Sequence, residues 1–406
     1  MQPAVIFLSL ISISKNNSEH QCSHTIYRTF SDIQHIFNSH IPVLINTMQK
    51  RLQEIDTLSL TLLMDNVTDR LLPNPYPFVK RAPMIANQKV LPSPVAEHGF
   101  SVLLEVANTK KESSDSQNKI KNDKSSKKNE KNKYLFDTGV SENGVVYNAD
   151  VFGIDLKDID AIILSHGHFD HVTGLSNVLN HISKKPTKVI CHPDAFLRRC
   201  IVFPDGNKAA LPSLDEESLV SQGAIFKKIT EPNFLPENKN KNHYDDNVFS
   251  TTATSSSASL LITGQIPRET KFEKGFPIQY KEDPANNNNL VPDPMVNDDQ
   301  AIIANIKHKG LVIITGCGHA GIVNTIKYAI SLTGINTIHA VIGGFHLTGG
   351  MYEDIIEQTI SELKNADPQY LVPCHCTGWK ATNRIIEIMP EKFIQASVGT
   401  SFEFSS

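Results

Sequence analysis

The stretch that decides the fold is Ala161–Gly174, with the sequence AIILSHGHFDHVTG. In it a short apolar strand is followed at once by three histidines and an aspartate: His166, His168, Asp170 and His171. Imidazole nitrogens and carboxylate oxygens suit Zn²⁺, Fe or Mn rather than Ca²⁺. We predict that His166 and His168 face one ion and that Asp170 and His171 face a second. A chance cluster of surface histidines is the alternative, and the position between a strand and a helix makes it the weaker interpretation.

Outward from this stretch, short apolar runs alternate with helical patterns. Strands are predicted at 57–64, 100–106, 134–136, 161–164, 188–191, 260–263, 301–306, 311–315, 340–342, 370–372 and 401–404. Helices are predicted at 173–182, 322–332, 355–363 and 381–389. Strands and helices that follow one another in this order indicate a layered α/β domain.

Composition and charge limit the class of protein. The 406 residues are 40% hydrophobic and 20% charged, with a formal net charge of −4. These values exclude collagen-like chains, mostly disordered chains and disulfide scaffolds. The acidic balance argues against nucleic-acid binding, and no apolar run reaches the ~20 residues that span a bilayer. The six cysteines do not pair by spacing, which favours reduced thiols and a cytoplasmic location.

Several polar segments interrupt the predicted domain. Residues 1–54 are predicted to be an N-terminal extension, partly disordered, and 55–406 a single domain. Disordered inserts are predicted within that domain at about 108–133, 238–257 and 282–289. Segments of this composition cannot bury enough apolar surface to offset the entropy that is lost on ordering.

The motif His166-x-His168-x-Asp170-His171 resembles the metal signature of the metallo-β-lactamase superfamily. The resemblance implies a four-layer αββα sandwich with two divalent metal ions at one edge of two packed sheets. Zn is the expected metal, with Fe or Mn as alternatives. Asp137, in the earlier FDTG, matches a family motif in which an aspartate orients a metal-binding histidine. A simple turn is the alternative interpretation of Asp137.

A narrower resemblance rests on seven segments in a fixed order: LLMDNVTD, AEHGFS, LSHGHFDHVTGL, DDQAI, ITGCGHAGIVN, VIGGFHL and VPCHCTG. Together they are similar to the dihydropteroate-synthase-like branch of the superfamily. This implies a metal-dependent transferase that acts on a pterin-like or phosphorylated small molecule. Hydrolysis of a small ester, lactone or phosphodiester is the alternative reaction. A non-enzymatic metal-binding or regulatory protein is the alternative of another class. A flavin-linked di-iron reductase of this fold is disfavoured, because such proteins usually carry Glu where this chain has His168.

The superfamily pattern implies further ligands after the motif. His319 is expected to complete the ligands of the first ion, and His375 those of the second. Cys317 lies about where the pattern has a bridging aspartate. Asp298 or Asp299 remains open as a substitute carboxylate, with a plain loop as the alternative.

Three residues carry predicted roles toward the substrate. His346, in GGFHL, is expected to contact substrate, and it competes with His375 for the last ligand position. His98, in AEHGFS, is a weaker candidate for substrate contact. Asp170 and His346 are the catalytic candidates, with Asp170 orienting the attacking water.

Overall fold

Two large β-sheets form the centre of the structure, a computed structural model that describes residues 52–107, 131–236, 258–283 and 285–406. The first sheet has eight strands in the order β12-β9-β8-β7-β6-β2-β21-β3. In chain order these are β2 (Thr57–Met64), β3 (Val79–Lys80), β6 (Ser101–Ala107), β7 (Asn132–Phe136), β8 (Ala161–Ile163), β9 (Thr187–Cys191), β12 (Ala224–Lys228) and β21 (Ser401–Ser405).

The second sheet has seven strands in the order β13-β14-β17-β18-β19-β20, with β1 paired to β17. They are β1 (Glu54–Ile55), β13 (Asn233–Leu235), β14 (Leu260–Ile262), β17 (Ala301–Ile306), β18 (Gly310–Thr315), β19 (Ile338–Gly344) and β20 (Tyr370–Cys374). A separate hairpin joins β4 (Ile85–Ala86) to β5 (Lys89–Val90).

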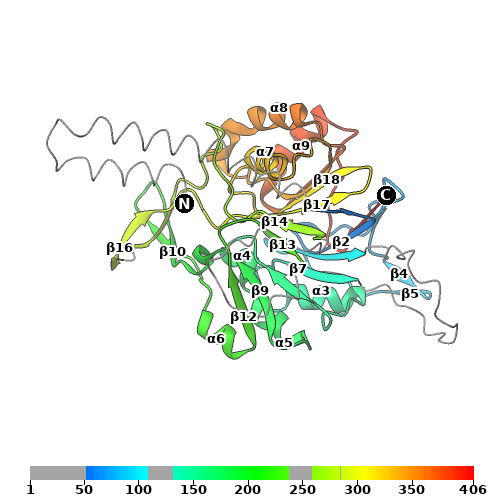
Figure 1. The fold of residues 1–406 in the computed structure, drawn as a ribbon, viewed down its shortest axis with the longest axis horizontal. Coiled ribbons are helices and arrows are strands. Elements are labelled where there is room, and N and C mark those ends of the chain that lie inside the picture. The colour runs from blue at the N-terminus through cyan, green and yellow to red at the C-terminus, as the bar shows by residue number, and fades with distance from the viewer. Residues whose placement is uncertain (1–51, 108–130, 237–257, 284) are drawn as a thin grey trace, which may run out of the picture. The chain divides into compact units, whose positions relative to one another are not determined.

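Helices cover the outer face of each sheet, which gives four layers (Figure 1). The eight-stranded sheet carries α3 (Gly144–Phe152), α5 (Leu175–His181) and α6 (Glu216–Ser221). The seven-stranded sheet carries α7 (Ile322–Thr333), α8 (Ile356–Ala366) and α9 (Trp379–Ile388). The predicted αββα sandwich is therefore confirmed. The described residues form a single compact unit.

The burial of the strands explains this layering. In β2, Leu58, Leu60 and Leu62 alternate with less buried residues and face the second sheet, where they join a core with Ile302 and Ile314. β17 and β18 are buried along almost their whole length, as expected of strands that are covered on both faces.

The direction of the strands brings several loops to one edge. β7 and β8 are parallel, and so are β18, β19 and β20. β2 runs antiparallel to β6, which runs antiparallel to β7, so β2 and β7 end at the same edge. Polar residues come within the first few positions after these strands, and they form the site described below.

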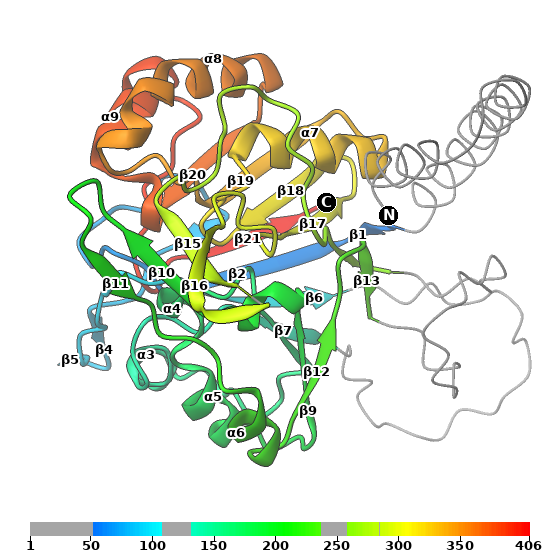
Figure 2. The same ribbon diagram turned by 90° about the vertical axis from the view of Figure 1, so that its left-hand side faces the viewer.

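A third, four-stranded sheet lies beside this edge, close to the short helix α4 (Phe169–Val172) (Figure 2). It contains β10 (Arg199–Val202), β11 (Lys208–Ala210), β15 (Gln279–Asp283) and β16 (Asn286–Pro292). The predicted disordered insert at 282–289 is therefore wrong for its described residues. Backbone pairing of β15 with β16 and β10 orders this hairpin, and such pairing does not depend on apolar side chains.

Other element boundaries in the structure also differ from those predicted from the sequence. β1 begins at Glu54, inside the predicted extension, and β7 begins at Asn132, inside the first predicted insert. The rest of those predictions, at 1–51, 108–130 and 237–257, lies outside the described residues. The helix predicted at 173–182 corresponds to α5, and the short α4 before it was not predicted. Among the residues that the structure describes, no helix has the length and apolar character needed to cross a membrane.

Candidate metal centre

The predicted ligands from both large sheets meet at the shared edge. His166 and His168 lie on the loop that follows β8, and Asp170 and His171 lie in α4, which begins directly after it. Cys317 and His319 follow β18, and His375 follows β20. All of these residues are buried, and none is more than 8% exposed. The structure thus brings together the six residues predicted as ligands, together with Cys317.

The first group of potential ligands contains His166, Cys317 and His319, whose ligand atoms all lie within 4.8 Å of one another. The ring of His168 stands beside them, with its centroid 4.6 Å from that of His166 and 4.7 Å from that of His319. Neither ring nitrogen of His319 has a hydrogen-bond partner, although the residue is only 3% exposed. A buried imidazole with both nitrogens unpaired is costly unless a ligand occupies the space between the rings.

Hydrogen bonds fix which nitrogen of His166 faces this group. The hydroxyl of Ser165 donates to Asp137 Oδ2 at 2.6 Å, so its oxygen must accept from His166 Nδ1 at 2.9 Å. His166 Nε2 is therefore unprotonated, and it lies 3.0 Å from His168 Nδ1. This leaves a lone pair on His166 pointing into the group of rings.

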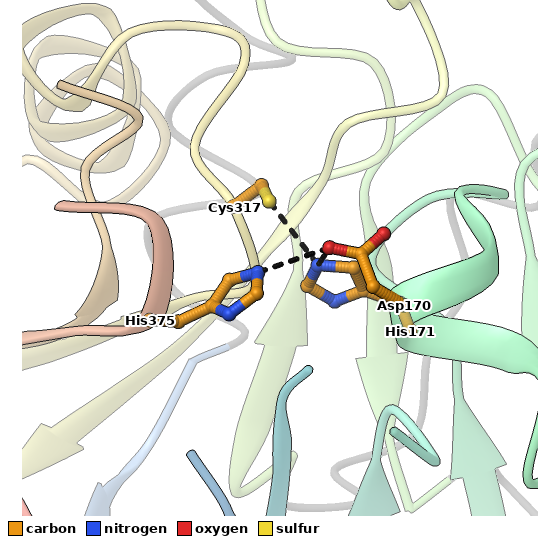
Figure 3. A group of neighbouring side chains, drawn as sticks. All are labelled: Asp170, His171, Cys317 and His375. Atoms are coloured by element: carbon orange, nitrogen blue, oxygen red, sulfur yellow. Dashed lines mark hydrogen bonds and ion pairs between the residues drawn. The ribbon is translucent and has the colours of Figure 1, made fainter. Parts of the chain in front are cut away.

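The second group contains Asp170, His171, Cys317 and His375, again within 4.8 Å (Figure 3). Asp137 Oδ2 accepts from His171 Nδ1 at 2.7 Å, so Asp137 does hold a histidine of the motif. In the neutral ring, His171 Nε2 then carries a lone pair, which lies 3.1 Å from Cys317 Sγ and 3.6 Å from Asp170 Oδ2.

His375 is oriented in the same way by Asn66. The Asn66 amide nitrogen donates to the backbone carbonyl of His375 at 3.2 Å, so the amide oxygen faces His375 Nδ1 at 3.0 Å and must accept from it. His375 Nε2 is left with a lone pair 3.2 Å from Asp170 Oδ2. Two acceptors at this distance repel each other unless a cation lies nearby.

The electrostatics of the second group favour a positive charge. Burial lowers the pKa of His171, but the carboxylates of Asp170 and Asp137 outweigh it and raise that pKa above its ordinary value. Burial raises the pKa of Asp170, yet His171 and His375 reverse this and hold that pKa far below its ordinary value. An ionised carboxylate beside two imidazoles in a buried place suits a metal cation.

The first group is neutral by contrast. Burial, with neighbouring histidines, lowers the pKa of His166 and of His319 well below the ordinary value. Neutral imidazoles are the form that binds metal. The two groups fit divalent metal ions, because they contain unpaired nitrogens, lone pairs that face each other, and N, O and S donor atoms. Cys317 belongs to both groups of potential ligands.

The two predicted substrate contacts lie at different depths. The Tyr352 hydroxyl donates to the Gly275 carbonyl at 3.2 Å, so it accepts from His346 Nε2 at 2.9 Å. His346 Nδ1 then has a lone pair and no partner, beside a small cavity that His319 and Tyr352 also line. His346 also lies within 4.8 Å of Cys317 and Cys376, so its position suits either predicted role.

His98 is exposed and lies at the rim, with its ring 4.9 Å from that of His375. Of the two aspartates left open as substitute ligands, Asp298 is engaged by Arg199 and by the backbone of Gly167, from which it accepts hydrogen bonds. Asp299 Oδ2 accepts from the backbone of Ala320, but Asp299 Oδ1 is buried without a hydrogen-bond partner among the described residues, so Asp299 stays open as a substitute ligand.

The backbone is also specialised here. Asp137, His346 and His375 have φ of 61°, 46° and 45°, in the left-handed region that non-glycine residues seldom adopt. Such conformations gather at functional sites, where the surrounding structure enforces them. A Cβ at Gly167, between His166 and His168, would overlap the backbone of Ala195, so only glycine fits.

Sequence reasoning missed three side chains that orient the predicted ligands: Ser165, Asn66 and Gln279. Ser165 adjoins the motif and Asn66 follows a predicted strand, so their positions at strand ends could have indicated them. Gln279 hydrogen-bonds His168 but belongs to no recognisable motif.

Comparisons with known proteins identify relatives of the chain and of its fold. The sequence model of the metallo-beta-lactamase superfamily matches residues 128–196. A 7,8-dihydropterin-6-methyl-4-(beta-D-ribofuranosyl)-aminobenzene-5'-phosphate synthase of Methanocaldococcus jannaschii is 32% identical over 314 residues, 76% of this chain and 90% of that protein. An uncharacterized protein of the same organism is 29% identical over 306 residues, 75% of this chain and 92% of that protein. A solved metal-dependent hydrolase of the beta-lactamase superfamily superimposes with a TM-score of 0.57 at 22% identity, covering 86% of this chain and 100% of that chain, which shows a common fold.

Proposed function

The chain belongs to the metallo-β-lactamase superfamily, and from this premise we propose that it is an enzyme that works with two divalent metal ions. The observation that carries the proposal is the convergence of unpaired ring nitrogens on a shared thiol. His319 has two such nitrogens and His375 has one, and each lies in a ligand group that includes Cys317. Hydrogen bonds alone do not satisfy these atoms.

We assign the ligands from the lone pairs. His166 Nε2, His168 Nδ1 and His319 would hold one ion. Asp170, His171 Nε2 and His375 Nε2 would hold the other, and the Cys317 sulfur would serve both. A thiolate among imidazoles and a carboxylate favours Zn over Mn. The same thiolate suits a reducing compartment such as the cytoplasm, because oxidation would remove a ligand.

The reaction we propose is a transfer that acts on a pterin-like or phosphorylated small molecule. The support is the 32% identity to the archaeal synthase, which extends over 90% of that protein. Bound metal ions would polarise a substrate oxygen. His346 lines the small cavity, and its Nδ1, left as an acceptor by the hydrogen bond to Tyr352, would accept from the substrate. His98 would contact the substrate at the exposed rim, and Asp170 would orient the nucleophile.

Metal content and a cobalt spectrum test the centre. Wild-type protein should bind two equivalents of Zn, and Co²⁺ substitution should give the near-ultraviolet charge-transfer band of a thiolate ligand. Cys317→Ser should lose that band. Cys374→Ser is the matched control, because Cys374 is buried nearby but donates to the Val372 carbonyl. Wild-type protein without bound metal, or a band that survives in Cys317→Ser, would refute the assignment.

Activity tests the reaction. The metal-loaded enzyme should transfer the pterin group of a dihydropterin pyrophosphate to an aminobenzene acceptor, with release of pyrophosphate, and His346→Ala should raise KM while the two metals stay bound. If phosphodiesters or lactones are hydrolysed and no transfer product forms, the protein is a hydrolase and the proposed transfer is wrong.

A further inference from the structure

We propose that Gln279 is a positioning residue of the metal centre, which holds His168 with Nε2–H turned toward the small sheet and Nδ1 turned toward the ions. Gln279 is the first residue of β15, and its side chain is completely buried. Its Oε1 lies 2.5 Å from His168 Nε2. The inference rests on the proposed function, since it assumes that His168 is a ligand.

The orientation of the Gln279 amide is fixed by its other partners. Its Nε2 donates to the backbone carbonyl of Asp293 and to Asp293 Oδ2, both at 3.1 Å. Both of these atoms accept only, so the amide nitrogen must be on that side and Oε1 must face His168. The nitrogen of His168 that meets Oε1 must therefore carry the proton.

This fixes the tautomer of His168. With the proton on Nε2, the lone pair of the neutral ring is on Nδ1. This nitrogen lies 3.0 Å from His166 Nε2, which also carries a lone pair. The two nitrogens cannot hydrogen-bond each other, and both face the group that contains His319. An acceptor on the far nitrogen of a metal-binding imidazole is the usual way to set its tautomer and ring angle. Here the acceptor is an amide rather than a carboxylate.

Arg199 of β10 connects this amide to the backbone of the motif. Its Nε donates to Asp293 Oδ2 at 3.0 Å, and its guanidinium donates to both oxygens of Asp298 at 2.5 and 3.0 Å. Asp298 in turn accepts from the Gly167 N–H at 2.8 Å. One arginine thus fixes both the side chain of His168, through Asp293 and Gln279, and the peptide that precedes it.

The charges of this network are balanced and buried. Asp293 and Asp298 carry two negative charges, opposed by Arg199 and by Lys281, whose Nζ lies 3.3 Å from Asp293 Oδ1. Buried ion clusters are weak contributors to stability, because desolvation offsets their attraction. A network of this kind, which ends on a ring nitrogen of a proposed ligand, is better explained by placement of that ring.

Two variants test the inference against a matched control. Gln279→Met keeps the size of the side chain but removes the acceptor, and Gln279→Asn keeps an amide for Asp293 but withdraws it from His168. Gln300→Met removes another buried glutamine amide, one that donates to the Leu164 carbonyl rather than bonding a histidine ring. Zinc affinity is measured by chelator competition, and the cobalt spectrum reports the geometry of each ion.

Both Gln279 variants should bind one of the two ions about 10- to 100-fold more weakly, with a changed cobalt ligand-field spectrum. Gln300→Met should match the wild type in both measurements. If the Gln279 variants bind both ions as the wild type does, this inference fails and the metal centre stands. If the wild type binds no metal, the proposed function fails as well.

A measurement on the wild-type protein tests the inference even if the Gln279 variants misfold. In ¹⁵N-histidine-labelled wild-type protein freed of metal, His168 should have its proton on Nε2, with its signals identified by their loss in His168→Asn. A proton on Nδ1 in that spectrum would overturn the inference whatever the affinities show.

Discussion

Replacement of Asp137 by asparagine should switch the tautomer of His171 without unfolding the protein. The Asp137 carboxylate accepts from the Ser165 N–H at 2.7 Å, from its hydroxyl at 2.6 Å and from His171 Nδ1 at 2.7 Å. Asparagine tolerates the φ of 61°, but it offers only one oxygen. If that oxygen stays on the Ser165 N–H, the new NH₂ group faces His171 Nδ1, which must then accept.

The change of tautomer alters the other ring nitrogen of His171, Nε2. His171 Nε2 would carry the proton and point it at Cys317 Sγ, 3.1 Å away, so it could no longer bind an ion. We expect the affinity for one ion to fall about 10- to 100-fold. Exchange of charged for neutral hydrogen bonds should reduce the free energy of unfolding by about 1–3 kcal/mol, a shift of several degrees in Tm.

The assay is zinc stoichiometry under chelator competition, with urea unfolding in parallel. Asp215→Asn is the control, because it makes the same exchange at a carboxylate that only caps α6, through the Ser218 N–H. An Asp137→Asn protein that holds both ions as tightly as the wild type would refute the tautomer argument.

Three further predictions concern the pH dependence of stability, the N-terminal cap of α7, and the close packing of Gly167 against the backbone of Ala195. Burial raises the pKa of Asp65 from 3.8 to about 6, so the native state keeps this proton longer than the unfolded state. In metal-free protein Asp65 should therefore contribute a fall of about 3 kcal/mol in the free energy of unfolding between pH 4 and 6, and Asp65→Asn should remove that contribution in urea titrations compared with the wild type. Glu273 accepts from two backbone N–H groups at the start of α7, so Glu273→Ala should lower the free energy of unfolding by about 1–3 kcal/mol, seen as a lower Tm. Gly167→Ala should displace the motif and lower the bound zinc at least about tenfold, whereas Gly350→Ala, where a Cβ meets no atom within 4 Å, should bind zinc normally.

The sequence predicted the parts of the fold that depend on side-chain pattern. The strand predicted at 301–306 agrees with β17, because its apolar run reports burial on both faces. The strand predicted at 57–64 agrees with β2, because its alternation reports one buried face. The small sheet was missed, since β15 and β16 are ordered by backbone pairing and their polar composition is typical of loops.

At the metal centre, too, the sequence predicted some residues and not others. Ligand candidates could be predicted because metal chemistry restricts them to a few residue types at strand ends. The residues that orient them could not, since any donor or acceptor in the right place serves. Asn66 acts through its amide oxygen on His375, and its position after a strand, which is the one signal it gives, is shared with ordinary turn residues.

The division of ligands between the sheets has a consequence for stability. His166, His168, Asp170 and His171 come from the eight-stranded sheet, whereas Cys317, His319 and His375 come from the seven-stranded sheet. Each proposed ion would therefore join one sheet to the other at the edge where their apolar core ends. Because such a site does not exist in the unfolded chain, the free energy of metal binding is also free energy of folding. The buried, unpaired imidazole of His319 costs stability in the metal-free protein, so bound metal would both add ligand bonds and remove this penalty.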